Sequence, residues 1–247
     1  MKTHRYHLNS IFSNYYLSLS SASWGIERER VQSNEMLELP AIIEKIELKN
    51  IEKISSIMDE IISIKKSDEV NQDISHLEKK IDQIIYNDIL KLTEDEQIII
   101  QDTLNYSLDL FENQEKSKAV FPVIDIDTYS KRITKELNKW LDGVDLKVSA
   151  THYYINSNCP LYMIKLSFGN ELKETKISNE DIYFGLKKIE KKLWHEEGQN
   201  IYFRKKLNYY DNEDVYIIKP NQRRFWSETA AMEDYRTLLV EILKMKE

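Results

Sequence analysis

Isoleucine and leucine recur at helical spacing through the first half of the chain. From residue 41 to 66 the apolar positions are mostly three, four or eight residues apart, and the same spacing returns at 74–85 after a polar break. Residues three or four apart share one face of an α-helix. We therefore predict two long antiparallel helices that pack along these faces. The inward residues would be Ile43, Ile46, Ile54, Ile57, Ile61 and Ile64, then Ile74, Leu77, Ile81, Ile84 and Ile85.

Two further helices are predicted in this half. A short amphipathic helix is expected within residues 8–19, where apolar and aromatic residues are spaced for one face. The sequence Thr93-Glu94-Asp95-Glu96 has the form of a capping box, which starts another helix. Its inward residues would be Ile100, Leu104, Leu108 and Phe111. The polar stretch 112–118 then indicates a linker, so we predict a mainly helical region at 1–118.

The spacing of apolar residues changes in the second half of the chain, from a helical pattern to segments typical of strands. Strands are predicted at 144–155, 161–168, 201–209 and 215–219 from their β-branched and aromatic residues, with Asp211-Asn212 as a hairpin turn. Helices are predicted after Thr128, after Ser178 and after Ser227 as N-caps. This pattern predicts an α+β fold in which residues 119–247 form a domain with a small antiparallel sheet and packed helices.

Charge is distributed unevenly along the chain. The net charge is −7, and residues 41–120 hold 10 Lys or Arg residues against 18 Asp or Glu residues. Residues 201–224 instead hold 6 Lys or Arg residues against 3 Asp or Glu residues. This balance disfavours nucleic-acid binding by the whole surface and leaves room for a local basic site. The single Cys159 and the lack of an apolar run of about 20 residues lead us to expect a cytoplasmic protein with no membrane segment.

One short segment combines a basic pair, two aromatic residues and a helix start. Residues 219–226 read Lys-Pro-Asn-Gln-Arg-Arg-Phe-Trp. In one interpretation the segment contacts nucleic acid, a phosphate or a partner, because guanidinium groups match phosphate and aromatic rings stack on bases. In the other, Phe225 and Trp226 pack on the sheet while the arginines pair with Asp or Glu. The candidate contact residues are Lys219, Gln222, Arg223, Arg224 and Trp226.

A second candidate contact lies at Arg28 and Arg30, which alternate with Glu27 and Glu29. This strip would either contact DNA or a partner, or form exposed ion pairs that contribute about 0 to 1 kcal/mol each.

Catalytic signals are weak. Glu-x-Lys, a fragment of many nuclease sites, occurs five times, as chance predicts in a chain so rich in both residues. His4 and His7 have metal-compatible spacing near the N-terminus, whereas His76, His152 and His195 are scattered, so structural or solvent-facing histidines are favoured over a metal site. No Gly-rich phosphate loop is present. We therefore assign no catalytic residues, no metal and no cofactor, and favour a binding role over an enzymatic one.

Two segments carry a family resemblance. Residues 12–40 contain Ser-Ser-Ala-Ser-Trp-Gly and Leu-Glu-Leu-Pro, and residues 217–234 contain the Lys-Pro-Asn-Gln-Arg-Arg-Phe-Trp core. Together they resemble the C-terminal target-recognition and helical spacer region of type IIG-like bacterial DNA methyltransferases and restriction enzymes. Because the methyltransferase motifs of such proteins are missing, the resemblance implies a detached chain without the catalytic core.

The resemblance implies a non-catalytic accessory or specificity-type subunit of a bacterial restriction-modification or anti-phage defence system. Its partner would be a methyltransferase or nuclease subunit, with DNA as a further contact. Two alternatives remain open: a small nuclease-like effector with a divergent site near Glu171 and Lys173, and a helical module that oligomerises through residues 41–111.

Overall fold

The computed structural model describes residues 10–21, 46–66, 73–153, 159–171, 176–178, 182–197 and 206–244. The chain divides into two compact units, Met1–Glu112 and Asn113–Glu247. The first unit is helical where it is described, and the second combines helices with a small sheet, so the fold class is α+β as predicted. Within the described residues, no helix has both the length and the apolar character needed to cross a membrane.

The helical unit is built on the predicted isoleucine faces. Its helices are α2 (Ile11–Ser20), α4 (Leu48–Lys66), α5 (Ser75–Gln83) with the π-helix η2 (Ile84–Ile89), α6 (Glu94–Asp102), the π-helix η3 (Thr103–Leu108) and α7 (Asp109–Asn113). Their buried apolar side chains form one cluster, so the predicted inward faces of α4 and α5 are confirmed where they are described. This cluster contains Ile54, Ile61, Leu77, Ile81, Ile85, Tyr86 and Ile100. Ile43 lies outside the described residues.

The capping box at the start of α6 is confirmed. The Glu96 carboxylate accepts from the Thr93 backbone N–H at 2.7 Å, and the Thr93 hydroxyl accepts from the Glu96 N–H at 3.3 Å. The inward position of Phe111 is wrong, because 49% of this residue is exposed. The π-helix η3 widens the turn between Ile100 and Phe111, so residues three and four apart no longer follow one line.

The polar stretch 112–118, predicted to be a linker, contains regular structure. It holds the 3-10 turn η4 (Gln114–Lys116) and leads into η5 (Lys118–Val120). The Ser117 hydroxyl accepts from the Ala119 N–H at 3.0 Å, and both residues are buried. The stretch therefore belongs to the folded second unit, and the division between the units falls at its start.

The second unit contains a five-stranded sheet in the order β3-β1-β2-β5-β4. The strands are β1 (Lys147–His152), β2 (Leu161–Gly169), β3 (Lys176–Ile177), β4 (Leu207–Asp211) and β5 (Asp214–Pro220). All neighbours are antiparallel except β3, which runs parallel to β1. The predicted hairpin joins β4 to β5, and Asn212 takes the left-handed backbone conformation there, with φ 55°.

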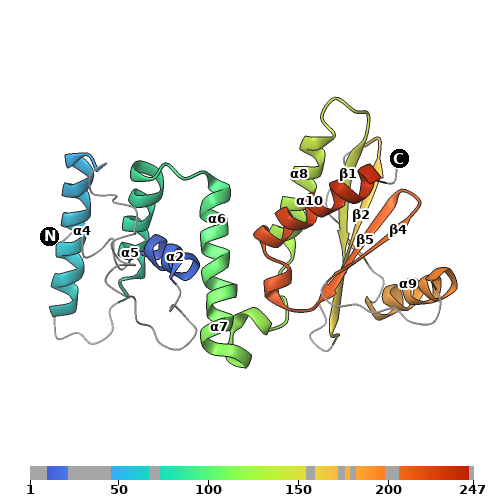
Figure 1. Ribbon diagram of the computed structural model, residues 1–247, viewed down its shortest axis with the longest axis horizontal. Coiled ribbons are helices and arrows are strands. Elements are labelled where there is room, and N and C mark those ends of the chain that lie inside the picture. Colours follow the sequence, from blue (N-terminus) through green and yellow to red (C-terminus); the bar gives the residue numbers. More distant parts are fainter. Residues whose placement is uncertain are drawn as a thin grey trace. The chain divides into compact units, whose positions relative to one another are not determined.

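Helices cover both faces of this sheet. The helices α8 (Asp127–Trp140) and α10 (Glu228–Lys244) pack on each other beside it, as Figure 1 shows. The Tyr162 ring packs against Trp226, next to α10. The neighbouring Met163 side chain instead packs closely against Gly185 of α9 (Ile182–Glu197). Successive strand residues point to opposite faces, which explains why Tyr162, Met163 and Ile164 are all buried.

The predicted helix starts have different outcomes. The Ser227 hydroxyl accepts from the Ala230 N–H at 3.2 Å, so Ser227 does open α10. Thr128 is not a cap: α8 begins at Asp127, and the Asp125 carboxylate accepts from the Asp127 N–H at 2.8 Å. Ser178 donates its N–H to His152 in β1, and residues 179–181 between it and α9 lie outside the described residues.

Candidate functional site

The candidate site is the loop between β5 and α10, residues 221–227, which we call the arginine loop. It contains the 3-10 turn η6 (Arg223–Phe225). Its first residue, Asn221, is buried and joins three segments of the unit. Its side-chain amide donates to Cys159 O at 3.0 Å, its side-chain oxygen accepts from Val123 N at 3.1 Å, and its backbone N–H donates to Pro160 O at 2.8 Å.

Trp226 closes the other end of the loop from inside the core. Only 2% of it is exposed, and its ring makes edge contacts with Tyr129 at 5.0 Å and Tyr162 at 5.2 Å between ring centres. Its indole N–H donates to Pro220 O at 3.0 Å. The prediction of Trp226 as a contact residue is therefore wrong, because its ring is enclosed by two tyrosines and cannot reach a base.

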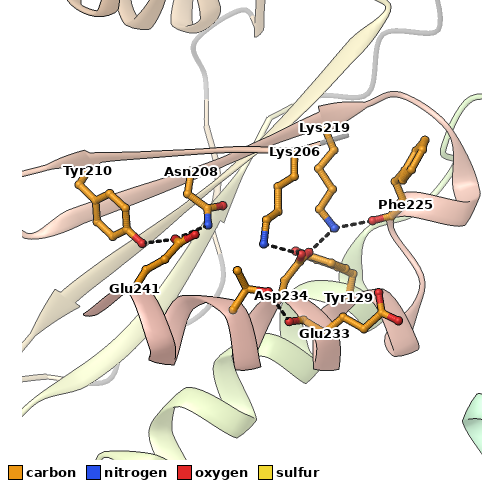
Figure 2. Close-up of polar contacts among 10 residues, drawn as sticks. Tyr129, Lys206, Asn208, Tyr210, Lys219, Phe225, Glu233, Asp234 and Glu241 are labelled. Atoms are coloured by element: carbon orange, nitrogen blue, oxygen red, sulfur yellow. Dashed lines mark hydrogen bonds and ion pairs between the residues drawn. The ribbon is translucent and has the colours of Figure 1, made fainter. Parts of the chain in front are cut away.

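Lys219 is also a core residue and not a surface contact, which corrects a second predicted site residue. Only 3% of it is exposed. Its ammonium group forms an ion pair with Asp234 and donates to Phe225 O at 2.6 Å, as Figure 2 shows. It also lies 4.5 Å from the ring centre of Tyr129 and 4.9 Å from that of Trp226.

The Asp234 carboxylate is the centre of this buried cluster. The Tyr129 hydroxyl donates to it at 2.6 Å, and Lys206 Nζ lies 3.1 Å from its other oxygen (Figure 2). One carboxylate thus pairs with two ammonium groups and accepts from a phenol, which offsets part of the cost of removing these charges from water. A few turns further along α10, Glu241 accepts from Asn208 and Tyr210 of β4, so the same helix is also tied to the edge strand.

Burial changes the proton affinity of this cluster. Burial lowers the pKa of Lys219 to about 8, although Asp234 acts in the opposite direction. Burial also raises the pKa of Tyr129, and the neighbouring Asp234 charge adds to this effect. At pH 7 Lys219 is therefore charged and the Tyr129 phenol is neutral.

The two arginines of the loop are half-buried and held in place. The Arg223 Nε–H donates to Pro122 O at 3.2 Å, and its guanidinium lies 5.9 Å from the ring centre of Phe121. The Arg224 Nε–H donates to the side chain of Gln222 at 3.0 Å, and its guanidinium lies 4.6 Å from the ring centre of Phe225. Gln222 thus orients an arginine from within the protein.

Neither arginine is neutralised within the described part of the chain. No carboxylate there forms an ion pair with Arg223 or Arg224, and their terminal Nη groups make no hydrogen bond to a described residue. The packing interpretation is therefore only partly right, and contact of the arginines with a ligand stays a prediction. Trp226 packs in the core as the packing interpretation requires, whereas the arginines are not paired with Asp or Glu as that interpretation also expects.

Several residues of the site were missed from the sequence. Tyr129, Lys206 and Asp234 complete the buried cluster, and Phe121 lies beside Arg223. The sequence did contain a signal for Asp234. This residue lies three residues after Ala231 and four before Leu238, so it shares a helix face with these buried apolar residues. A carboxylate on an apolar stripe indicates a buried partner.

The remaining candidate residues do not join this site. Arg28 and Arg30 lie outside the described residues, as does Lys173 of the nuclease alternative. Among the described residues, no group of three or more His, Cys, Asp or Glu side chains could hold a metal ion.

The helical unit has a separate groove of about 680 Å³ between α4 and the α5–η2 helix. It is lined by residues of both charges together with polar and aliphatic side chains, among them Glu52, Lys53, Ile57, Lys80 and Asp88.

Comparisons with family models, with curated proteins and with solved structures each found no match to this chain.

Proposed function

We propose that this chain is a non-catalytic accessory or specificity-type subunit of a bacterial restriction-modification or anti-phage system, and that its arginine loop contacts the DNA backbone. The observation that carries the proposal is the pair of adjacent guanidinium groups, Arg223 and Arg224, which are fixed in place and not neutralised by a described carboxylate. The resemblance of residues 217–234 to the C-terminal region of type IIG-like enzymes supports the same assignment.

The chemistry of the loop favours phosphate as the ligand. The guanidinium group is planar and presents paired N–H donors that match two phosphate oxygens. Because the Nε–H of each arginine is already bonded within the protein, the plane of each group is set and the Nη donors remain for a ligand. Such preorganisation lowers the entropy lost on binding. With a net charge of −7, the chain depends on such a local site to attract DNA.

In this proposal the helical unit serves as a spacer and as the docking surface for a methyltransferase or nuclease subunit. Its groove between α4 and α5 carries both charges, as in Lys53 and Asp88, whose charged atoms lie 3.9 Å apart. Mixed charge of this kind suits recognition of a protein surface better than wrapping of DNA.

The test is DNA binding by the full chain, measured by fluorescence anisotropy with a labelled duplex over a range of salt concentrations. Replacing both Arg223 and Arg224 with Ala should weaken binding at every sequence and reduce the slope of log K against log salt by roughly 2, since each phosphate contact releases about 0.9 counterion.

The matched control replaces the exposed Lys187 and Lys188 of α9 with Ala, which removes the same charge from the same unit. This pair should leave the slope nearly unchanged. An equal loss in both double variants, or no loss in either, would show that the arginine loop is not the DNA contact.

A further inference from the structure

One of the buried side chains that attach the arginine loop to the core comes from the preceding strand. Lys219 lies in β5, yet its ammonium group donates to Phe225 O, six residues later in η6. The Phe225 ring in turn lies beneath the guanidinium of Arg224. The backbone N–H of Trp226 also donates to Arg223 O at 3.0 Å, so a backbone hydrogen bond closes the same turn whose Phe225 carbonyl accepts from Lys219.

We propose that Lys219 is a positioning residue for DNA binding: its buried ammonium, held by Asp234, fixes the Phe225 carbonyl and thereby the orientation of Arg223 and Arg224. This inference rests on the proposed function, because it assigns a role in the same site. Lys219 does not touch the ligand, since only 3% of it is exposed. It acts through the loop backbone.

The neighbours of Lys219 make this role dependent on pH. Asp234 of α10 and Tyr129 of α8 contact its ammonium, Lys206 next to β4 shares Asp234 with it, and the exposed Glu233 of α10 acts on it only through its charge. Burial lowers the pKa of Lys219 to about 8, and Lys206 acts in the same direction. Above this pH the ion pair with Asp234 and the attraction to the two aromatic rings are lost, whereas Arg223 and Arg224 stay charged because guanidinium pKa values exceed about 12.

Deprotonation of Lys219 does not weaken the fold as a whole. Because the pKa of Lys219 is lower in the folded state, the unfolded chain binds more protons above pH 8, and this group makes stability rise with pH in that range. Unfolding caused by the titration of Lys219 itself would therefore not explain a loss of DNA affinity between pH 7 and 9.5.

The experiment compares two lysines that share one carboxylate. Lys219→Met and Lys206→Met each remove an ammonium group from Asp234, but only Lys219 bonds to the arginine loop. At pH 7 we expect Lys219→Met to weaken duplex binding about tenfold, the size of one good charge-assisted contact, and Lys206→Met to stay within about twofold.

The pH profile separates positioning from simple stability. At constant ionic strength, the affinity of the wild-type chain should fall as the pH rises through 8, whereas Lys219→Arg, which keeps its charge, should give a flat profile. Equal losses in Lys219→Met and Lys206→Met, or an unchanged wild-type affinity from pH 7 to 9.5, would overturn the inference.

A second readout does not require DNA. The indole N–H of Trp226 donates to Pro220 O at the base of the loop and lies next to Lys219. Its cross-peak in a ¹H–¹⁵N spectrum, assigned by its loss in Trp226→Phe, should move with a midpoint near pH 8 in the wild type and not in Lys219→Met. If the arginine variants leave DNA affinity unchanged, the proposed function fails, and this titration still decides whether Lys219 holds the loop. A cross-peak that does not titrate would show that it does not.

Discussion

Both units of the molecule bury a carboxylate, but the two carboxylates differ in the partners that surround them. In the second unit, Asp234 has two ammonium partners and a phenol donor. In the helical unit, Asp82 is equally buried, yet among the described residues its hydrogen-bond donor is the Ile11 N–H at 3.4 Å, and no described cation pairs with it. Ion pairs and a hydrogen-bond donor offset much of the cost of burying the charges around Asp234, whereas the Asp82 charge has no such compensation among the described residues.

The proton affinities follow from this difference. Burial raises the pKa of Asp82 to about 6, the Ile11 N–H opposes this, and the nearby Glu78 raises it further. Folded Asp82 therefore keeps a proton that the unfolded chain loses near pH 4, and its contribution to the stability of the helical unit falls as the pH rises from about 4 to 6. The Lys219 cluster acts in the opposite sense and at alkaline pH, because its pKa is lowered.

The largest expected effect is at the centre of the compensated cluster. Asp234→Ala leaves the Lys219 ammonium buried without its carboxylate and the Tyr129 hydroxyl without its acceptor. The free energy of unfolding of the second unit should fall by about 3 to 5 kcal/mol. Denaturant unfolding followed by circular dichroism measures this loss. The adjacent Glu233→Ala, which removes an exposed carboxylate from the same helix, should cost less than about 0.5 kcal/mol. Similar small losses in both variants would mean that the cluster is not compensated as described.

A smaller effect of opposite sign is expected in the helical unit. Asp82→Asn removes the buried charge and keeps an oxygen that accepts from the Ile11 N–H. We expect the variant to be more stable than the wild type by about 1 to 3 kcal/mol at pH 7 and equally stable near pH 4. Thermal unfolding at several pH values checks this prediction.

The control for Asp82 is Asp88→Asn in the neighbouring η2 helix, where the carboxylate is solvent-accessible and 3.9 Å from Lys53. Its effect on stability should be below about 1 kcal/mol at either pH. If Asp82→Asn were less stable than the wild type at pH 7, the Asp82 carboxylate would have a favourable partner besides the Ile11 N–H.

The smallest effect is expected at the arginine loop itself. The double variant Arg223→Ala and Arg224→Ala should change the free energy of unfolding by less than about 1 kcal/mol, since both side chains are half-buried and not ion-paired within the described residues. A shift in melting temperature of many degrees would instead show that their contacts with Phe121 and Phe225 are part of the core. The arginine loop would then stabilise the fold, as the Asp234 cluster does.

Local features were predictable because their signals lie within a few residues. The Thr93 capping box, the Ser227 cap, the hairpin at Asn212 and the isoleucine faces of α4 and α5 all follow from spacing or turn chemistry. The errors arose where a local signal was overridden. Phe111 is turned outward by a π-helix, and the polar stretch 112–118 leads into the second unit, where Ser117 and the following Ala119 are buried.

The sequence by itself determined the α+β class, the helical first region and the presence of a basic, aromatic segment before the last helix. Only the tertiary structure decided which of its residues face solvent. Lys219 and Trp226 are buried because Tyr129, some 90 residues earlier, and Asp234, in the next helix, meet them in the folded unit. Spacing along a chain specifies which side chains share a face, but burial of a charge depends on partners that only folding brings together.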